Sequence, residues 1–246
     1  MKKIIIALTI WFCLCAPAFA SIDAETVYNT HPSEFSFITE ESVNDTLQQI
    51  DNLIKTNSEM TYVWYNRRSV EYGARWDLQI SWRPSVKILT GQQLTDSEMR
   101  TKEKAEETLR FVVADDMSDY QKVFEIYHWI QNRTEYDHAA AERERFRHEN
   151  NPCDNATGVF FDGKAVCDGY ADAFYLLSNM TGIDSYFVHG GNHCWNIVKL
   201  RDTWYYIDVT DESGYCFLRG TDWLEKHGYV VESYVPIEVS KTDYAF

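Results

Sequence analysis

Three residues in the second half of the chain have the types and order needed for nucleophilic acyl transfer: Cys167, His193 and Asp208. In such chemistry a thiolate attacks an amide carbonyl, an imidazole takes and returns the proton, and a carboxylate orients the imidazole. Each residue alone has an ordinary structural explanation, such as a buried cysteine or a hydrogen-bonded histidine. Their occurrence together, on the elements predicted below, is the more specific signal.

Cys167 lies where a glycine-punctuated turn runs into a helix. Residues 161–169 read Phe-Asp-Gly-Lys-Ala-Val-Cys-Asp-Gly, and apolar residues then recur at helical spacing until Gly182. The first turn of a helix favours a thiolate and offers N–H groups to an oxyanion, because the helix dipole stabilises negative charge there. We predict substrate or oxyanion support from Gly163, Val166 and Trp195.

A predicted β-hairpin brings His193 and Asp208 together. Residues 193–210 alternate like two strands around a two-residue turn at 201–202. In that register His193 and Asp208 are diagonal neighbours on one face, about 7–8 Å apart and within reach of long side chains. A slip of one residue would place them on opposite faces. Cys194 points to the other face, away from the proposed site.

Three segments resemble, in this order, the core motifs of the bacterial transglutaminase-like superfamily. They are 163–171 (Gly-Lys-Ala-Val-Cys-Asp-Gly-Tyr-Ala), 193–196 (His-Cys-Trp-Asn) and 204–210 (Trp-Tyr-Tyr-Ile-Asp-Val-Thr). Segment 117–137 resembles the two-helix lead-in of that family, so the likeness covers about residues 95–220.

The resemblance implies an α+β fold with a papain-like core, in which a nucleophile-bearing helix packs on an antiparallel sheet. Matched block by block, the family's catalytic triad falls on Cys167, His193 and Asp208. Two features depart from the family pattern. Cys194 stands where a small residue is usual, and segment 138–152 is longer than typical. The long segment is strongly charged; we predict a solvated helix or loop, and the alternative is a lid that gates access.

The remaining cysteines leave the disulfide pattern open. Two bridges would use Cys153, Cys167, Cys194 and Cys216, and one bridge would leave two thiols. The departure at Cys194 allows a disulfide near the site, with Cys153 or Cys216 as partner. No C-x-x-C, H-E-x-x-H or EF-hand pattern occurs, so we expect no metal and no cofactor, and calcium dependence is not signalled.

The N-terminus predicts export. Lys2 and Lys3 precede an apolar run and an A-x-A site, which indicates a signal peptide over residues 1–20, cut after Ala20. Cleavage leaves 21 basic against 38 acidic residues, a net charge of −17. This balance argues against nucleic-acid and anionic-membrane binding, which need clustered Lys and Arg. We expect a secreted, periplasmic or cell-surface protein with no membrane association after cleavage.

Two regions follow the signal peptide. Residues 21–94 are predicted to form an N-terminal α/β accessory region: a helix over 43–54, then a meander with strands at 62–65, 69–72 and 76–82. Its aromatic residues fit a core, and a ligand-binding face is the alternative. Residues 95–246 form the predicted transglutaminase-like catalytic domain, whose first two helices begin at capping boxes starting with Thr95 and Ser118.

Together these features predict an exported cysteine hydrolase or acyltransferase that acts on amide bonds of peptides or proteins, cell-wall peptide among them. We prefer hydrolysis by a peptidase or amidase over cross-linking, because the sequence shows no amine-donor site. The alternative is a non-catalytic extracellular binding or cell-surface module that keeps the fold. A disulfide at Cys167 would favour that alternative. The sequence leaves substrate identity and oligomeric state open.

Overall fold

The computed structural model describes residues 34–39, 41–56, 60–70, 73–144, 151–211, 213–232 and 237–246. The predicted signal peptide, residues 1–20, and residues 145–150 of the charged segment lie outside this part. Within it, no helix is long and apolar enough to cross a membrane. Helices and antiparallel sheets occur together, which confirms the predicted α+β class.

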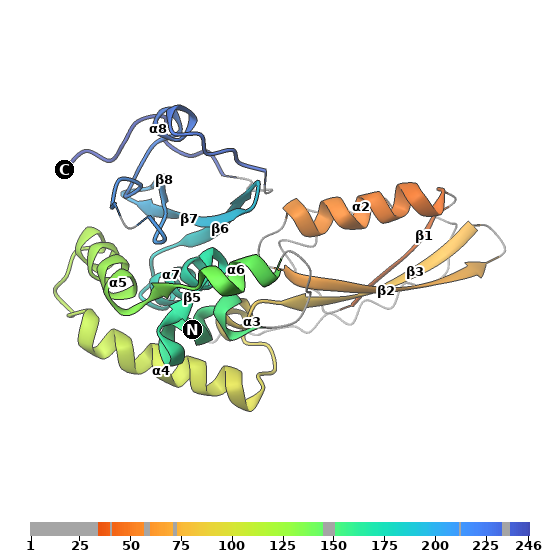
Figure 1. The fold of residues 1–246 in the computed structure, drawn as a ribbon, viewed down its shortest axis with the longest axis horizontal. Coiled ribbons are helices and arrows are strands. Elements are labelled where there is room, and N and C mark those ends of the chain that lie inside the picture. Colours follow the sequence, from red (N-terminus) through yellow and green to blue (C-terminus); the bar gives the residue numbers. More distant parts are fainter. Residues whose placement is uncertain are drawn as a thin grey trace, which may run out of the picture.

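An antiparallel sheet and one helix, α2 (Val43–Thr56), form the N-terminal part, which projects to one side of the body (Figure 1). The strand order is β1 (Glu34–Thr39), β3 (Gly73–Trp82), β2 (Met60–Val70). Apolar side chains of α2, β1 and β3 form one buried cluster that holds the layer together: Phe37, Ile50, Ala74, Trp76 and Leu78, with Leu47 packed against it.

The predicted helix and the strand at 76–82 are confirmed, but the meander is wrong in two details. A single strand, β2, runs through 60–70 where we predict two short ones, and β1 was not predicted. The polar pair Arg67 and Arg68 suggests a break, yet both continue the strand. The reason is pairing with β3: Arg67 lies over the Trp76 ring at 5.9 Å and Arg68 binds Asp77 at 2.9 Å.

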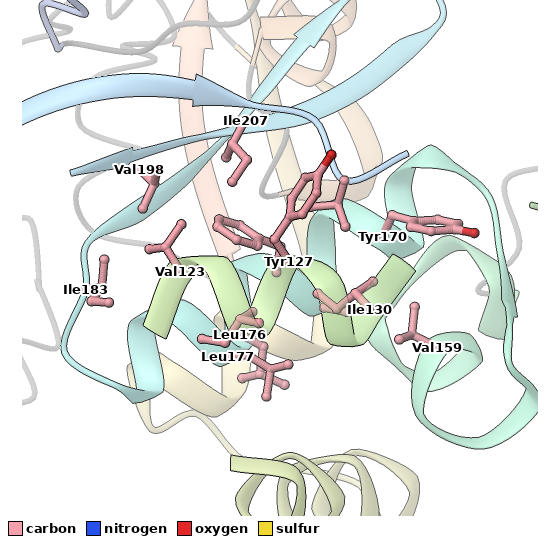
Figure 2. Packing of buried hydrophobic residues seen from close by; sticks show 14 of the residues in the cluster. Val123, Tyr127, Ile130, Val159, Tyr170, Leu176, Leu177, Ile183, Val198 and Ile207 are labelled. Atoms are coloured by element: carbon pink, nitrogen blue, oxygen red, sulfur yellow. The ribbon is translucent and has the colours of Figure 1, made fainter. Parts of the chain in front are cut away.

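The body is built around α7 (Cys167–Met180), and every residue from Gly169 to Ser178 is buried. A helix that is buried all round must be covered on every side. Helices α3 (Pro84–Thr90), α4 (Asp96–Val112) and α5 (Asp119–Arg133) pack on it, and the β6–β7–β8 sheet covers another side (Figure 1). Figure 2 shows Tyr127 and Ile130 of α5 against Leu176 and Leu177 of α7.

The predicted helix starts of α4 and α5 are confirmed. Thr95 accepts from the Glu98 N–H at 3.3 Å while the Glu98 carboxylate accepts from the Thr95 N–H at 2.7 Å. Ser118 and Gln121 form the same box at α5. The shorter elements are β4 (Glu135–Tyr136), α6 (His138–Glu144), a 3-10 turn η1 (Pro152–Asp154), a π-helical turn η2 (Gly158–Asp162), β5 (Lys164–Ala165) and α8 (Thr221–Lys226).

The predicted hairpin register is confirmed. The sheet consists of β6 (Ser185–Gly190), β7 (His193–Leu200) and β8 (Thr203–Ile207). Leu200 pairs with Thr203, and the β7–β8 pairing continues to Asn196 opposite Ile207. Both turn residues have positive φ, 50° at Arg201 and 61° at Asp202, as a two-residue hairpin turn with matched twist requires.

The end of β3 and helix α3 pack directly on the start of α7. Trp82 and Val86 share a buried cluster with Cys167, Ala171 and Tyr175. The domain boundary that we predict after residue 94 stays a prediction, and residues on its N-terminal side belong to the surroundings of Cys167.

Gly169 lies in the first turn of α7, which is tightly packed. A Cβ at this position would lie 2.8 Å from the Ala165 Cβ and would overlap the Cys153 carbonyl oxygen. Alanine normally stabilises a helix relative to glycine, by about 1 kcal/mol. We nevertheless expect Gly169→Ala to lower the free energy of unfolding by about 1–3 kcal/mol, because the overlap strains the packing. Urea unfolding measures this, with exposed Glu106→Ala in α4 as control; a stabilised Gly169→Ala protein would contradict the packing.

Candidate active site

Cys167 is the first residue of α7 and is 7% exposed. The residue before it, Val166, has an extended backbone and directly follows β5. The Val166 N–H donates to the Cys153 carbonyl at 3.0 Å, which ties the start of α7 to η1. The thiol is therefore held at the N-terminal end of a buried helix, where the helix dipole favours negative charge.

His193 and Asp208 form the second part of the site. The imidazole Nε2 lies 2.7 Å from Oδ2 of Asp208, a carboxylate that is only 2% exposed. Thr210 donates its N–H to Oδ1 at 2.9 Å, and the Tyr229 hydroxyl donates to Oδ2 at 2.8 Å. Asp208 is thus held from several directions, and its orientation fixes that of the His193 ring.

The charges of this pair are set by their mutual contact. Burial disfavours ionised Asp208, but hydrogen bonds from His193, Thr210 and Tyr229 outweigh it and lower the pKa of the carboxyl. Burial also disfavours the imidazolium, yet the hydrogen bonds with Asp208 and Cys167 raise the pKa of His193 to about 10. His193 therefore bridges the carboxylate and the thiol. Since Nε2 faces Asp208, Nδ1 is the nitrogen left for proton exchange with Cys167.

The sequence analysis missed Tyr136 as a site residue. Its side chain makes hydrogen bonds with the backbone and the thiol of Cys167. Burial and the neighbouring Cys167 raise the pKa of Tyr136 to about 12, so the hydroxyl keeps its proton. The available signal was its place in the family's lead-in segment, which carries no information on distance to Cys167.

Arg83, between β3 and α3, is the second missed residue. Its guanidinium binds the carboxylate of Asp168, donates to the Asp154 carbonyl at 3.2 Å and lies over the Phe187 ring at 4.9 Å. Burial opposes ionisation of Asp168, but Arg83 outweighs it and lowers the pKa of that carboxyl. The Cys167 thiol in turn lies 3.7 Å from Oδ2 of Asp168. Arg83 thus anchors the residue next to the nucleophile.

The three predicted supporting residues occupy different places. The N–H groups of Gly163 and Val166 are used by the carbonyls of Gly158 and Cys153, so neither is a free oxyanion donor. The Gly163 carbonyl accepts from Glu135, which holds the Tyr136 strand beside β5. Their roles towards a substrate stay predictions.

Trp195 and Cys194 lie on opposite faces of β7, as alternation requires. The Trp195 ring packs against the His193 ring, with centroids 5.5 Å apart and planes inclined by 24°. Cys194 points away from His193 but shares the buried cluster of Cys167, which corrects the expectation that it points away from the site. The reason is that α7 covers that face of the sheet, so residues opposite His193 still approach the nucleophile helix.

The cysteines of the described residues, Cys153, Cys167, Cys194 and Cys216, are all buried thiols. The same part of the chain contains no group of three His, Cys, Asp or Glu side chains that could bind a metal ion.

Part of the chain matches a known protein family. The model for the transglutaminase-like superfamily matches residues 106–209, which include Cys167, His193 and Asp208. This segment belongs to the transglutaminase-like superfamily. Arg83 and Tyr229 lie outside the transglutaminase-like segment, although both contact its central residues.

Two curated relatives are similar to part of the chain. The kyphoscoliosis peptidases of Homo sapiens and Mus musculus are each 28% identical over 134 residues, covering 48% of this chain and 20% of those proteins. The chain thus spans about a fifth of the length of these relatives.

Two solved structures are more distant. A TGase has a TM-score of 0.44 and 18% identity over 79% of this chain and 55% of its own. A candidate protease from Parabacteroides distasonis has a TM-score of 0.37 and 13% identity over 74% and 41%.

The ionisation of His193 is directly measurable. We expect its ring to titrate near pH 10 and not near 6.5, and Asp208→Asn to bring this down by about one to three pH units. Because the pKa of His193 is raised on folding, the stabilisation is full below pH 6.5 and is lost as pH rises through about 10. Ring ¹⁵N and ¹H shifts of His193 measure the titration. A His193 ring that titrates near pH 6.5 would contradict the contacts described.

Proposed function

We propose that this protein is an exported cysteine hydrolase that cleaves amide bonds in peptides or proteins through Cys167, His193 and Asp208. The observation that carries the proposal is the unbroken series of contacts from Asp208 to His193 to Cys167 at the start of α7. Membership of residues 106–209 in the transglutaminase-like superfamily supports the reaction class.

In the first step the thiolate of Cys167 attacks the amide carbonyl carbon, while His193 carries the proton taken from the thiol. The carbonyl oxygen becomes an oxyanion, and the Cys167 N–H and the Tyr136 hydroxyl, which contact each other at the start of α7, are the donors that would stabilise it. The C–N bond then breaks, His193 gives its proton to the leaving nitrogen, and an acyl thioester remains on Cys167.

In the second step water attacks the thioester and His193 takes one of its protons. The C–S bond breaks, the carboxylic acid leaves, and the returned proton restores the thiol and imidazole pair. An amine in place of water would give a new amide by the same path. We keep the preference for water, and the naming of both curated relatives as peptidases supports it.

Export and substrate belong to the same proposal. The signal-peptide pattern of residues 1–20 supports secretion, a periplasmic site or the cell surface, where peptide or protein substrates such as cell-wall peptide are accessible.

The test uses 4-nitrophenyl acetate as an acyl donor of known chemistry. We expect a burst of 4-nitrophenolate and one acetyl group on Cys167, located by peptide mass mapping. Cys167→Ala should abolish the adduct, and His193→Ala should slow its formation at least about 100-fold, since it removes the base. Cys153→Ala, which removes another buried thiol, is the matched control and should keep the burst.

The fate of the acetyl group decides between water and amine. With added methylamine we expect acetate as the main product, and N-methylacetamide in excess would mean that transfer is preferred. A wild-type protein that acquires no acetyl group at Cys167 would overturn the enzymatic proposal and favour a binding module.

A further inference from the structure

A pocket of about 350 Å³ opens beside His193, between the β6–β7 turn and the segment that follows α8. His193 and Trp195 form one wall, and residues 227–230 form the other. Glu232 completes the lining at the surface. The mechanism described above uses only His193 of these residues.

Close backbone contacts build this pocket. The Glu232 N–H donates to the His189 carbonyl at 2.8 Å, which pairs the segment with the end of β6. At Gly190 a Cβ would overlap the Val230 carbonyl oxygen, so only glycine permits this approach. Tyr229 links the pocket to the site, because its hydroxyl binds Asp208 while its ring meets Trp195 at 5.2 Å.

The position beside His193 determines which part of a substrate the pocket faces. His193 returns its proton to the leaving nitrogen, so the leaving group must lie on the His193 side of the scissile amide. The side chain of the residue that follows this amide is therefore nearest to the pocket. This step rests on the proposed function.

The lining favours a cation on an apolar stem. Tyr229 supplies aromatic surface, with the buried Trp195 ring packed behind it, and such surface binds both methylene groups and cations. Glu232 supplies a carboxylate, of which Oε2 accepts the Gly191 N–H at 3.1 Å. The described lining contains no lysine or arginine, and the positive charge of its His193 is paired with the Asp208 carboxylate at 2.7 Å.

We propose that this pocket binds the lysine or arginine side chain of the residue that follows the scissile amide. The stem lies along the Tyr229 ring, and the charged end reaches Glu232 at the surface. The pocket thus selects the leaving group, whereas the reacting atoms are handled by Cys167 and His193.

The first experiment measures binding without catalysis. Cys167→Ala protein is titrated with lysine amide and with norleucine amide, which has nearly the same stem and no side-chain charge. The indole ¹⁵N–¹H signal of Trp195, assigned with Trp195→Phe, reports occupancy. We expect lysine amide to shift this signal at lower concentration than norleucine amide. Glu232→Gln should weaken the binding of lysine amide about threefold to tenfold and leave the binding of norleucine amide unchanged.

Glu225→Gln is the matched control, because Glu225 is an exposed acid on α8 that does not line the pocket. It should leave both affinities unchanged. Equal binding of the two amides, or equal loss in both Gln variants, would overturn the assignment of a cationic ligand.

The second experiment profiles cleavage of a peptide mixture by mass spectrometry, comparing wild type with Glu232→Gln. We expect wild type to cleave before lysine and arginine, and Glu232→Gln to lose this preference. Cleavage with no such preference would overturn the pocket assignment and leave the hydrolase proposal intact. Selective lysine amide binding without any cleavage would support the pocket and contradict the hydrolase proposal.

Discussion

The site depends first on the pairing register of β7 and β8. His193 begins β7 and Asp208 directly follows β8, and their 2.7 Å contact exists only because the hairpin pairs Leu200 with Thr203. A shift of one residue would turn one side chain to the opposite face. The positive φ angles of the turn at 201–202 fix this register locally, far from the site itself.

The second constraint is the burial of α7, which fixes where the thiol can lie. Its first turn is held by Arg83 through Asp168, while Asp172 further along is buried and binds Ser85 and the Ala156 N–H. Burial raises the pKa of Asp172, and the hydrogen bonds from Ser85 and Ala156 fix the position of its carboxyl group. These bonds join the β3–α3 segment to α7, so residues from the N-terminal half hold the start of the helix that carries Cys167.

The features that depend on residues close together in the sequence were predicted correctly. Capping boxes, the start of α7 at Cys167 and the hairpin turn all depend on residues a few positions apart, and these predictions are confirmed. Tyr136, Arg83 and Tyr229 were missed because their contacts span distant parts of the chain. No periodicity reveals such a contact before the fold is known. The polar run in β2 was misread for the same reason, since its partners lie on β3.

If Cys167 and His193 act as proposed, His193 holds a proton taken from Cys167 at neutral pH. Iodoacetamide labelling at pH about 6, with each cysteine located by peptide mass mapping, tests it on unreduced protein. The account predicts that Cys167 is labelled much faster than Cys153, Cys194 and Cys216, and that His193→Ala abolishes this advantage. Labelling of Cys167 that is blocked by a disulfide, or unchanged in His193→Ala, would contradict the account.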